Sequence, residues 1–364
     1  MGWPINTKEK ELTLMLESVQ YGKSGLSVSR LCLGTMNFGE PGVGQHGSWT
    51  LSIDEARPIF KAAMEQGLYY FDCANNYGMG ASERVVGALL RELFPRESYV
   101  LSTKLIMPMS DGPNQAGLSR KHVMESINAS LKRLGHDYVD QLIVHRHPSV
   151  VPNTPVGPLE EGLEALHDVV KAGKALYLGA SSMYTWQFIQ MRMTAERHGW
   201  HKFISMQNHY NLIYREEERE MHPYCGQEGI AVTPWSPLAR GVLTGSYKGG
   251  FDNGGTKRSQ GRDAERTRGL YTGDMEFKIV DRVADVADKL GHTPAQIALA
   301  WMLSKPVITA PIVGVSRLEQ LEQLIAATKI KLSAADITHL EELYRPVNNI
   351  LDDEKPLSTT VKNH

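Results

Sequence analysis

The sequence predicts an α/β fold, a (β/α)8 TIM barrel in a single domain with an N-terminal β-hairpin. Eight short apolar runs, each typical of a buried strand, alternate along the 364 residues with longer stretches of helical periodicity. No shift in composition divides this alternation, and eight strands separated by helices favour a closed parallel barrel. The runs span residues 30–35, 69–73, 99–103, 138–144, 175–180, 203–207, 230–234 and 307–313.

Local signals place the elements around these strands. A turn at Lys23-Ser24-Gly25 predicts the short hairpin, which would close the bottom of the barrel ahead of the first strand. Two pairs of residues, Ser52 with Glu55 and Thr293 with Gln296, have the spacing of a capping box. Each pair therefore marks the start of a helix.

The predicted barrel takes up most of the chain. We expect an N-terminal extension at residues 1–16, the barrel at 17–345 and a C-terminal tail at 346–364. The main irregular stretch, 246–274, is rich in Gly, Arg and Lys. Because structureless loops of this length are usually functional or mobile, we interpret it as a cofactor clamp, with a plain surface loop as the alternative. The charged run 215–220 is interpreted as a solvated helix face.

The composition argues against several classes of function. A net charge of −2 provides no electrostatic footprint for nucleic acid or an acidic membrane. No apolar run approaches membrane-spanning length, and the first twenty residues contain no signal-peptide core. The three cysteines (Cys32, Cys73 and Cys225) form no paired motif, so we expect reduced thiols and a cytoplasmic protein. The expected partner is a small-molecule substrate, and the oligomeric state is left open.

Four side chains suited to acid–base chemistry follow three consecutive predicted strands. Asp72 and Tyr77 lie at the end of the second strand, Lys104 ends the third, and His145 ends the fourth. The carboxyl ends of barrel strands form one rim, so these residues should meet there. Carbonyl reduction needs a proton donor, and a lysine cation beside a tyrosine lowers the pKa of the phenol. Asp72 would hold the lysine in place, and His145 would donate a hydrogen bond to the substrate oxygen.

With these residues at its strand ends, the chain resembles the aldo-keto reductase family over nearly its whole length. The resemblance is to the aryl-alcohol-dehydrogenase-like branch and the related potassium-channel β subunits. Matching motifs follow the other strands: Gly34-Thr35-Met36, Gly179-Ala180-Ser181-Ser182, Gln207, the run from Trp235 to Gly241, and Gly314-Val315-Ser316-Arg317 with Gln320 and Gln323. The resemblance implies an NADP(H)-dependent oxidoreductase that reduces aldehydes or ketones, such as aromatic or small aldehydes, to alcohols. Asp72, Tyr77, Lys104 and His145 would be its catalytic residues.

The resemblance also implies a binding site for NADP(H). Its residues would be Thr35, Met36, Ser181, Ser182, Gln207, Trp235, Ser236, Leu238, Arg240, Gly241, Gly314, Ser316, Arg317, Gln320 and Gln323. Those after the fifth and sixth strands would hold the nicotinamide carboxamide, Trp235 would stack on its ring, and those after the seventh would line the pyrophosphate. Ser316 would open the last barrel helix, where free N–H groups and Arg317 favour a 2′-phosphate. The two glutamines would reach the adenosine.

Three positions qualify this assignment. Ser246 stands where channel-subunit relatives carry a phosphate-binding lysine, which leaves Lys248 or the arginines of 246–274 as substitutes. Leu324 stands where many members have an adenine-contacting Asn. Ser316 also has the capping-box spacing with Glu319, so the serine would serve either a phosphate or its own helix.

Two other functions fit parts of the pattern. A cofactor-binding regulatory subunit of the channel β-subunit type would share the fold, but those relatives depart from the family at the position of His145. A metal-dependent barrel hydrolase would draw on His145-Arg146-His147 with His209 and His222, but no carboxylate–histidine spacing accompanies them, and we expect no metal. A Rossmann dehydrogenase is disfavoured because no G-x-G-x-x-G follows a predicted strand.

Substrate specificity is expected to depend on two loops that follow the first and third strands. These are residues 37–50 and 106–120. Trp49, Met107 and His147 are the candidates for the wall of the substrate pocket.

Overall fold

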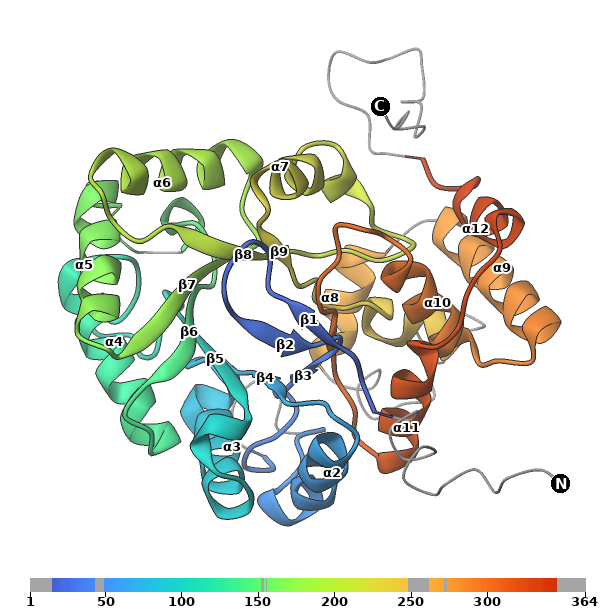
Figure 1. The fold of residues 1–364 in the computed structure, drawn as a ribbon, viewed down its shortest axis with the longest axis horizontal. Helices are drawn as coiled ribbons and strands as arrows, with labels where there is room; N and C mark the ends of the chain where they lie inside the picture. The colour runs from blue at the N-terminus through green and yellow to red at the C-terminus, as the bar shows by residue number, and fades with distance from the viewer. Residues whose placement is uncertain are drawn as a thin grey trace, which may run out of the picture.

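Eight parallel strands curl into a barrel, as the sequence predicts (Figure 1). The computed structural model describes residues 15–42, 49–151, 154, 156–247, 262–271 and 274–345. In order around the sheet, the strands are β10 (Ile312–Val313), β3 (Cys32–Gly34), β4 (Tyr70–Asp72), β5 (Val100–Leu105), β6 (Val139–Val144), β7 (Ala175–Ser181), β8 (Phe203–Gln207) and β9 (Ala231–Val232). Each lies at one of the eight predicted runs, which confirms the predicted fold class.

The two ends of this sheet meet between β9 and the residues that lead into β10. Val232 forms a parallel bridge with Ile308, and the Thr309 N–H donates to the carbonyl oxygen of Val232 at 2.8 Å. Further along the same two segments, the Ile312 N–H donates to the carbonyl oxygen of Pro234, also at 2.8 Å. These bonds close the barrel and pair backbone groups that an open sheet edge would leave exposed.

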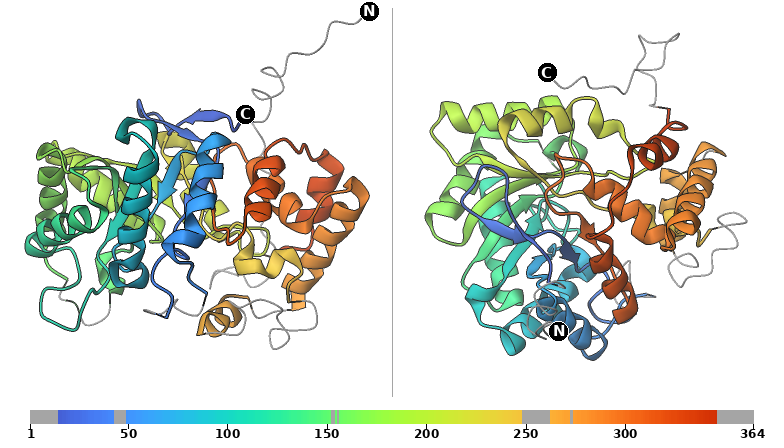
Figure 2. Two further views of the ribbon diagram at one scale, coloured as in Figure 1. Left: turned by 90° about the horizontal axis from the view of Figure 1, so that it is seen from below. Right: turned by 45° about the vertical axis from the view of Figure 1, so that its right-hand side comes forward.

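Helices surround the barrel and pack their apolar faces on it (Figures 1 and 2). They are α2 (Ile53–Glu65), α3 (Ala81–Leu93), α4 (Arg120–Leu134), α5 (Leu159–Lys171), α6 (Thr185–Arg197), α7 (Met221–Glu228), α8 (Arg262–Leu270), α9 (Asp274–Leu290), α10 (Pro294–Leu303), α11 (Leu318–Ala327) and α12 (Ala334–Glu341). Short 3-10 helices lie at Tyr77–Gly80, Arg96–Ser98, Pro148–Val150, Glu216–Glu218 and Ala239–Thr244. Both predicted capping boxes are present, at Ser52 for α2 and at Thr293 for α10. Within the described residues, none of the helices combines the length and apolarity that crossing a bilayer requires.

The predicted hairpin covers the amino-terminal end of the barrel (Figure 2). Its strands β1 (Ser18–Gln20) and β2 (Ser27–Ser29) are antiparallel, and Tyr21 points inward from the turn. The Tyr21 hydroxyl lies 3.0 Å from the Tyr70 hydroxyl and donates to Gln141 Oε1 at 3.1 Å. A side chain at Gly22 would meet the Gly229 carbonyl oxygen at 2.5 Å, so the hairpin can dock only because this position has no Cβ. With this end closed, the opposite end is left for a site.

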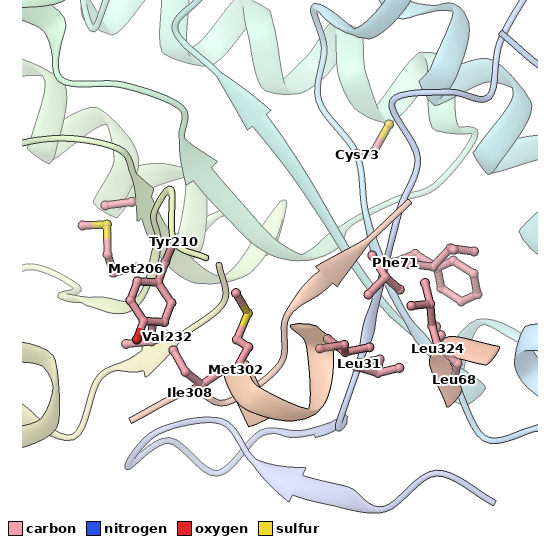
Figure 3. Close-up of a cluster of buried hydrophobic side chains, with 14 of the residues drawn as sticks. Leu31, Leu68, Phe71, Cys73, Met206, Tyr210, Val232, Met302, Ile308 and Leu324 are labelled. Carbon is pink, nitrogen blue, oxygen red and sulfur yellow. The ribbon is translucent and has the colours of Figure 1, made fainter. Parts of the chain in front are cut away.

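The largest apolar core lies between the strands and the ring of helices. Figure 3 shows part of it, where Leu31, Leu68 and Phe71 gather beside Leu324 of α11. Phe71 also stacks on Phe60 of α2, with ring centroids 5.2 Å apart. Burying a side chain of this size contributes about 1.5–3 kcal/mol, so this layer anchors the strands whose far ends carry the site.

Two sequence interpretations are wrong in the described residues. The second half of 246–274 is not irregular, because it contains α8 and the start of α9; residues 248–261 and 272–273, with Lys248, lie outside the described residues. The run 215–220 is not a solvated helix face. Arg215 is 3% exposed and pairs with Glu218 at 2.8 Å and with Glu341 of α12 at 3.2 Å. A carboxylate distant in sequence therefore draws the run inward.

Candidate active site

The carboxyl ends of β4, β5 and β6 bring the four predicted catalytic residues together. Asp72 ends β4, and parallel pairing sets it beside Ser102 of β5, two residues before Lys104. Tyr77 begins the 3-10 helix that follows β4, and the backbone N–H of His145 donates to the Leu105 carbonyl oxygen at 3.1 Å. Side chains alternate along a strand, so Ser102 and Lys104 point to the same face as their neighbour Asp72.

Lys104 is the centre of the group. Its ammonium nitrogen Nζ donates to Asp72 Oδ2 at 2.5 Å, to the Cys73 carbonyl oxygen at 2.7 Å and to the Tyr77 hydroxyl at 3.3 Å. All three of its N–H bonds therefore have a partner. Burial opposes the charge of Lys104, but the Asp72 carboxylate and the Tyr77 and Cys73 side chains together outweigh burial and raise the pKa of the ammonium, which keeps its proton at neutral pH.

Asp72 is as fully engaged as the lysine it holds. Its second oxygen, Oδ1, accepts from the Ser102 hydroxyl at 2.8 Å and from the Gln207 amide nitrogen at 2.7 Å. The resemblance assigns Gln207 to the nicotinamide, and the structure shows that its amide nitrogen also reaches the Asp72 carboxylate. Ser102 was missed by sequence reasoning, although its position two residues before Lys104 on the same strand could have indicated it.

The rings of Tyr77 and His145 lie next to each other in an edge-on contact. Their ring centroids are 5.9 Å apart at an interplanar angle of 78°. Burial lowers the pKa of His145 well below its ordinary value, and the nearby Arg146, Lys104 and Arg266 cations lower it further. The imidazole is therefore neutral at neutral pH. Its Nδ1 is buried without a hydrogen-bond partner in the described residues.

The pKa of Tyr77 departs from the sequence expectation. The Lys104 cation lowers it, as expected, but burial raises it by more and the Asp72 carboxylate adds to the rise. The net direction is upward, opposite to the lowering inferred from the lysine alone. Tyr77 is consequently a neutral phenol that carries a proton at neutral pH.

The segments that follow β8 and β9 contribute a stack of three aromatic rings. His209 lies between Tyr214 and Trp235, with ring centroids at 4.2 and 4.3 Å, and the Trp235 indole N–H donates to the Ser182 hydroxyl at 2.8 Å. Ser182 and Ser236 have positive φ angles of 43° and 55°. Non-glycine residues rarely adopt this conformation, and such strained residues cluster at functional sites.

The remaining predicted cofactor residues lie near this stack or at the ends of β3 and β10. Thr35 is buried and bonds to the Asp72 carbonyl oxygen at 2.9 Å, whereas Met36 is partly exposed. Leu238 and Gly241 are partly exposed beside the buried Arg240, whose Nε donates to Thr267 of α8 at 3.1 Å. The described part of the 246–274 stretch thus lies against the residues expected to line a pyrophosphate.

The start of α11 differs from the sequence expectation by one residue. The N-cap position of the helix is Arg317, not Ser316, and the Arg317 side chain makes no capping bond. The expected capping box of Ser316 with Glu319 is wrong, because both the N–H and the hydroxyl of Ser316 donate to Gln320 Oε1, at 2.8 and 3.1 Å. Gly314, Ser316, Arg317 and Gln323 are exposed, and the Gln323 carbonyl accepts from Gln296 at 3.2 Å. Among the described residues, no N-cap side chain bonds the N–H groups of this helix end, which suits an anion.

The structure also shows the surroundings of Leu324 and Ser246, the two residues that depart from the family pattern. Leu324 is 3% exposed and belongs to the apolar core, where a polar Asn would lack partners (Figure 3). The Ser246 hydroxyl lies 2.7 Å from that of Thr244.

The histidines of the alternative metal site are engaged separately. His147 Nδ1 contacts Ser149, His209 Nε2 contacts the Tyr271 hydroxyl, and His222 Nε2 contacts the Asn208 amide. Among the described residues, no three His, Cys, Asp or Glu side chains gather in a metal-holding arrangement. Cys32, Cys73 and Cys225 are all free and buried.

The sequence of the chain is similar to that of known proteins over nearly its whole length. The model of the Aldo/keto reductase family matches residues 30–345. A Schizosaccharomyces pombe protein named as a candidate aryl-alcohol dehydrogenase is 43% identical over 354 residues, covering 90% of this chain and 95% of the relative. The versiconal hemiacetal acetate reductase of Aspergillus parasiticus is 39% identical over 91% of this chain and 98% of its own length. An aldo-keto reductase of Fusarium vanettenii is 38% identical over 89% of this chain and 90% of its own.

Proposed function

The chain belongs to the aldo/keto reductase family, in its aryl-alcohol-dehydrogenase-like branch, and from this premise we propose that it reduces aldehydes to alcohols with NADPH and with Tyr77 as the proton donor. Membership makes the protein an oxidoreductase that acts on small carbonyl compounds, and the family generally uses NAD(P)H. The observation that carries the finer proposal is the position of Lys104 Nζ between the Asp72 carboxylate and the Tyr77 hydroxyl.

Each residue of the group has a separate part in the proton transfer. The Tyr77 phenol holds the proton that the substrate oxygen takes up as negative charge develops on it. Loss of that proton leaves a phenolate 3.3 Å from the Lys104 ammonium, which stabilises the new charge. The ion pair with Asp72 keeps the ammonium charged and in place. The neutral His145 imidazole can donate a hydrogen bond to the same substrate oxygen without competing for its proton.

The residues on the other side of the mouth fit a nicotinamide dinucleotide, which supplies the hydride when bound. Trp235 presents a partly exposed ring held by the Ser182 hydroxyl and by the stack on His209. The uncapped start of α11 and the exposed guanidinium of Arg317 offer backbone donors and a positive charge to a phosphate. Because NADPH differs from NADH only by its 2′-phosphate, Arg317 supports the choice of NADPH.

The rim of the mouth favours an aromatic or other apolar substrate. Tyr184 and Trp186 follow the end of β7 and are 68% and 60% exposed. The ring of His147 lies 6.3 Å from that of Trp186, which supports the expected role of His147 in the pocket wall. Large exposed aromatic side chains at a site opening supply apolar area for a ligand.

The direct test is consumption of NADPH by the purified protein with a panel of aromatic and aliphatic aldehydes and ketones. We expect multiple turnovers per protein molecule, fastest with aromatic aldehydes. A tightly held cofactor that is oxidised only once would instead indicate a regulatory subunit of the channel β-subunit type. His145 favours the enzyme, because channel-subunit relatives depart at this position.

A further inference from the structure

Arg146 is a partly buried cation at the mouth of the barrel for which the proposed chemistry has no use. It follows His145 at the end of β6. Its Nη1 donates to the His145 carbonyl oxygen at 2.6 Å and to the Ser181 hydroxyl at 3.3 Å, and its guanidinium carbon lies 5.8 Å from the centre of the Trp235 ring. Both acceptors are neutral. Within the described part of the chain, Arg146 forms no ion pair.

The free part of this guanidinium is the edge that recognises carboxylates. Nε and Nη2 make no hydrogen bond to any described residue, and neither is a buried atom without a partner. These two N–H groups lie parallel on one side of the fork and suit the two oxygens of one carboxylate. Among the residues that the structure describes, this edge therefore has no partner.

The charges around Arg146 increase its need for an anion. Burial lowers the pKa of Arg146 to about 10 and the nearby Arg266 lowers it further, so it is still a cation at neutral pH. Asp72 cannot neutralise it, because both Asp72 oxygens are held by Lys104, Ser102 and Gln207. A desolvated charge without a counter-ion is costly to the fold, and an arriving anion would offset that cost.

We propose that Arg146 is a specificity-determining residue that binds an anionic group, foremost a carboxylate, on the carbonyl substrate. This inference rests on the proposed function of the same site. The substrates selected are oxo acids and formyl-substituted aromatic acids, with the carbonyl at Tyr77 and His145 and the anionic group at the Nε–Nη2 edge. The predicted phosphate-binding residues Arg240, Ser316 and Arg317 follow β9 and β10, whereas Arg146 follows β6 directly after His145, between the proposed proton donor and the predicted nicotinamide residues Ser181 and Trp235.

The test compares each acid with its neutral ester. We would measure kcat/KM for 3- and 4-formylbenzoate and for their methyl esters, in the wild type, Arg146→Gln and Arg146→Lys. Arg146→Gln should lower kcat/KM for the better acid by roughly 10- to 100-fold, the loss expected for a hydrogen bond to a charged group, and leave its ester nearly unchanged. Arg146→Lys should restore part of the loss, because it keeps the charge without the fork.

A matched control separates this local effect from a change in net charge. Arg282 of α9 pairs with Glu342 at 2.6 Å near α12, and Arg282→Gln removes the same charge outside the mouth. It should alter neither acid nor ester kinetics. An equal loss on acid and ester in Arg146→Gln, or a loss confined to NADPH affinity, would overturn the proposal and assign Arg146 to the cofactor.

A binding measurement keeps the inference testable if no aldehyde is turned over. Calorimetric titration of 4-(hydroxymethyl)benzoate into the protein, with and without NADP⁺, should show binding that Arg146→Gln weakens by a similar factor. Absence of turnover with such binding would reject the proposed reductase but retain the anion site. Turnover of neutral aldehydes with no preference for acid over ester in the wild type would do the reverse.

Discussion

Arg146 and Arg215 are two arginines that the barrel treats in opposite ways. Both follow a strand of the barrel and lie beside a tryptophan, with guanidinium carbons 5.8 Å from the Trp235 ring and 5.6 Å from the Trp301 ring. Arg215 binds two carboxylates, from Glu218 and Glu341. Burial opposes its charge, but these carboxylates raise its pKa, whereas the pKa of Arg146 is lowered.

The difference separates a structural network from a binding site. Around Arg215, the hydroxyl of Tyr344 donates to Glu216, and Trp301 and Lys305 both donate to Glu341. These bonds connect the segment after β8 to α12 and supply carboxylates that balance the charge of Arg215. At the mouth, Arg146 and the His145 Nδ1 keep hydrogen-bonding capacity that no described residue uses. Saturated polar clusters stabilise a fold, whereas unsaturated ones mark sites where a ligand completes the set.

The largest expected effect is a loss of activity, without a loss of stability, when a residue at the mouth of the barrel is changed. Tyr77→Phe removes the phenolic proton but keeps the ring that faces His145. We expect kcat to fall about 10²–10⁴-fold, the usual contribution of general acid catalysis, with an unchanged melting temperature and NADPH affinity. Steady-state kinetics, thermal denaturation and cofactor titration measure the three quantities. Near wild-type turnover would remove Tyr77 from its role.

The second effect is a change in the preference for NADPH over NADH, and it tests the start of α11. Arg317→Ala should weaken NADPH binding by about one to two orders of magnitude, as expected for a charge-assisted hydrogen bond, and leave NADH binding nearly unaffected. The loss should shrink at high salt, because Arg317 is exposed and its charge is screened. Cofactor titration by fluorescence at two salt concentrations measures this. Equal weakening of both cofactors would show that no 2′-phosphate binds there.

How much of this site could be foreseen depends on how local the signals are. The strand ends carrying Asp72, Lys104 and His145 were predictable because apolar runs and motifs coincide there. The network of Arg215 was not, because its partner Glu341 lies 126 positions away and no periodicity links the two. The pairing of Ser316 with Gln320 was missed for a different reason. Two acceptors, Glu319 and Gln320, compete for one serine, and only the geometry of the turn decides between them.

For the network around Arg215 we expect the complementary result, in which stability falls and activity does not change. Arg215→Met keeps the length that packs on Trp301 but leaves Glu218 without its cation and Glu341 with Lys305 alone. We expect the free energy of unfolding to fall by about 2 kcal/mol, between the values for exposed and buried pairs, with kcat unchanged. The matched variant Arg146→Met should not lower it, since no ion pair is lost. Denaturant unfolding of both variants compares them directly, and a larger loss for Arg146→Met would reverse the contrast drawn here.

The last effect is a change in how stability depends on pH, and it is carried by a histidine beside the network of Arg215. His222 is buried against Tyr210, with ring centroids 4.5 Å apart, and burial lowers its pKa to about 4. Below its ordinary pKa of about 6.5, the unfolded chain binds a proton that the folded protein does not. His222 therefore makes the free energy of unfolding decrease on acidification from about pH 6.5 towards 4, by at most about 1.4 kcal/mol per pH unit.

His222→Gln isolates this contribution, because glutamine keeps an acceptor for the Asn208 amide but does not titrate in this range. The variant should be somewhat less stable than the wild type at pH 7.5, where only packing has changed, and should lose less stability between pH 6.5 and pH 4.5. Urea unfolding at a series of pH values gives both slopes. Other buried histidines, His209 among them with a pKa lowered to about 3, retain their own share of the acid sensitivity, so the slope should decrease without vanishing. Parallel slopes for variant and wild type would mean that His222 is protonated equally in the folded and unfolded protein, and that its burial against Tyr210 does not exclude the charge.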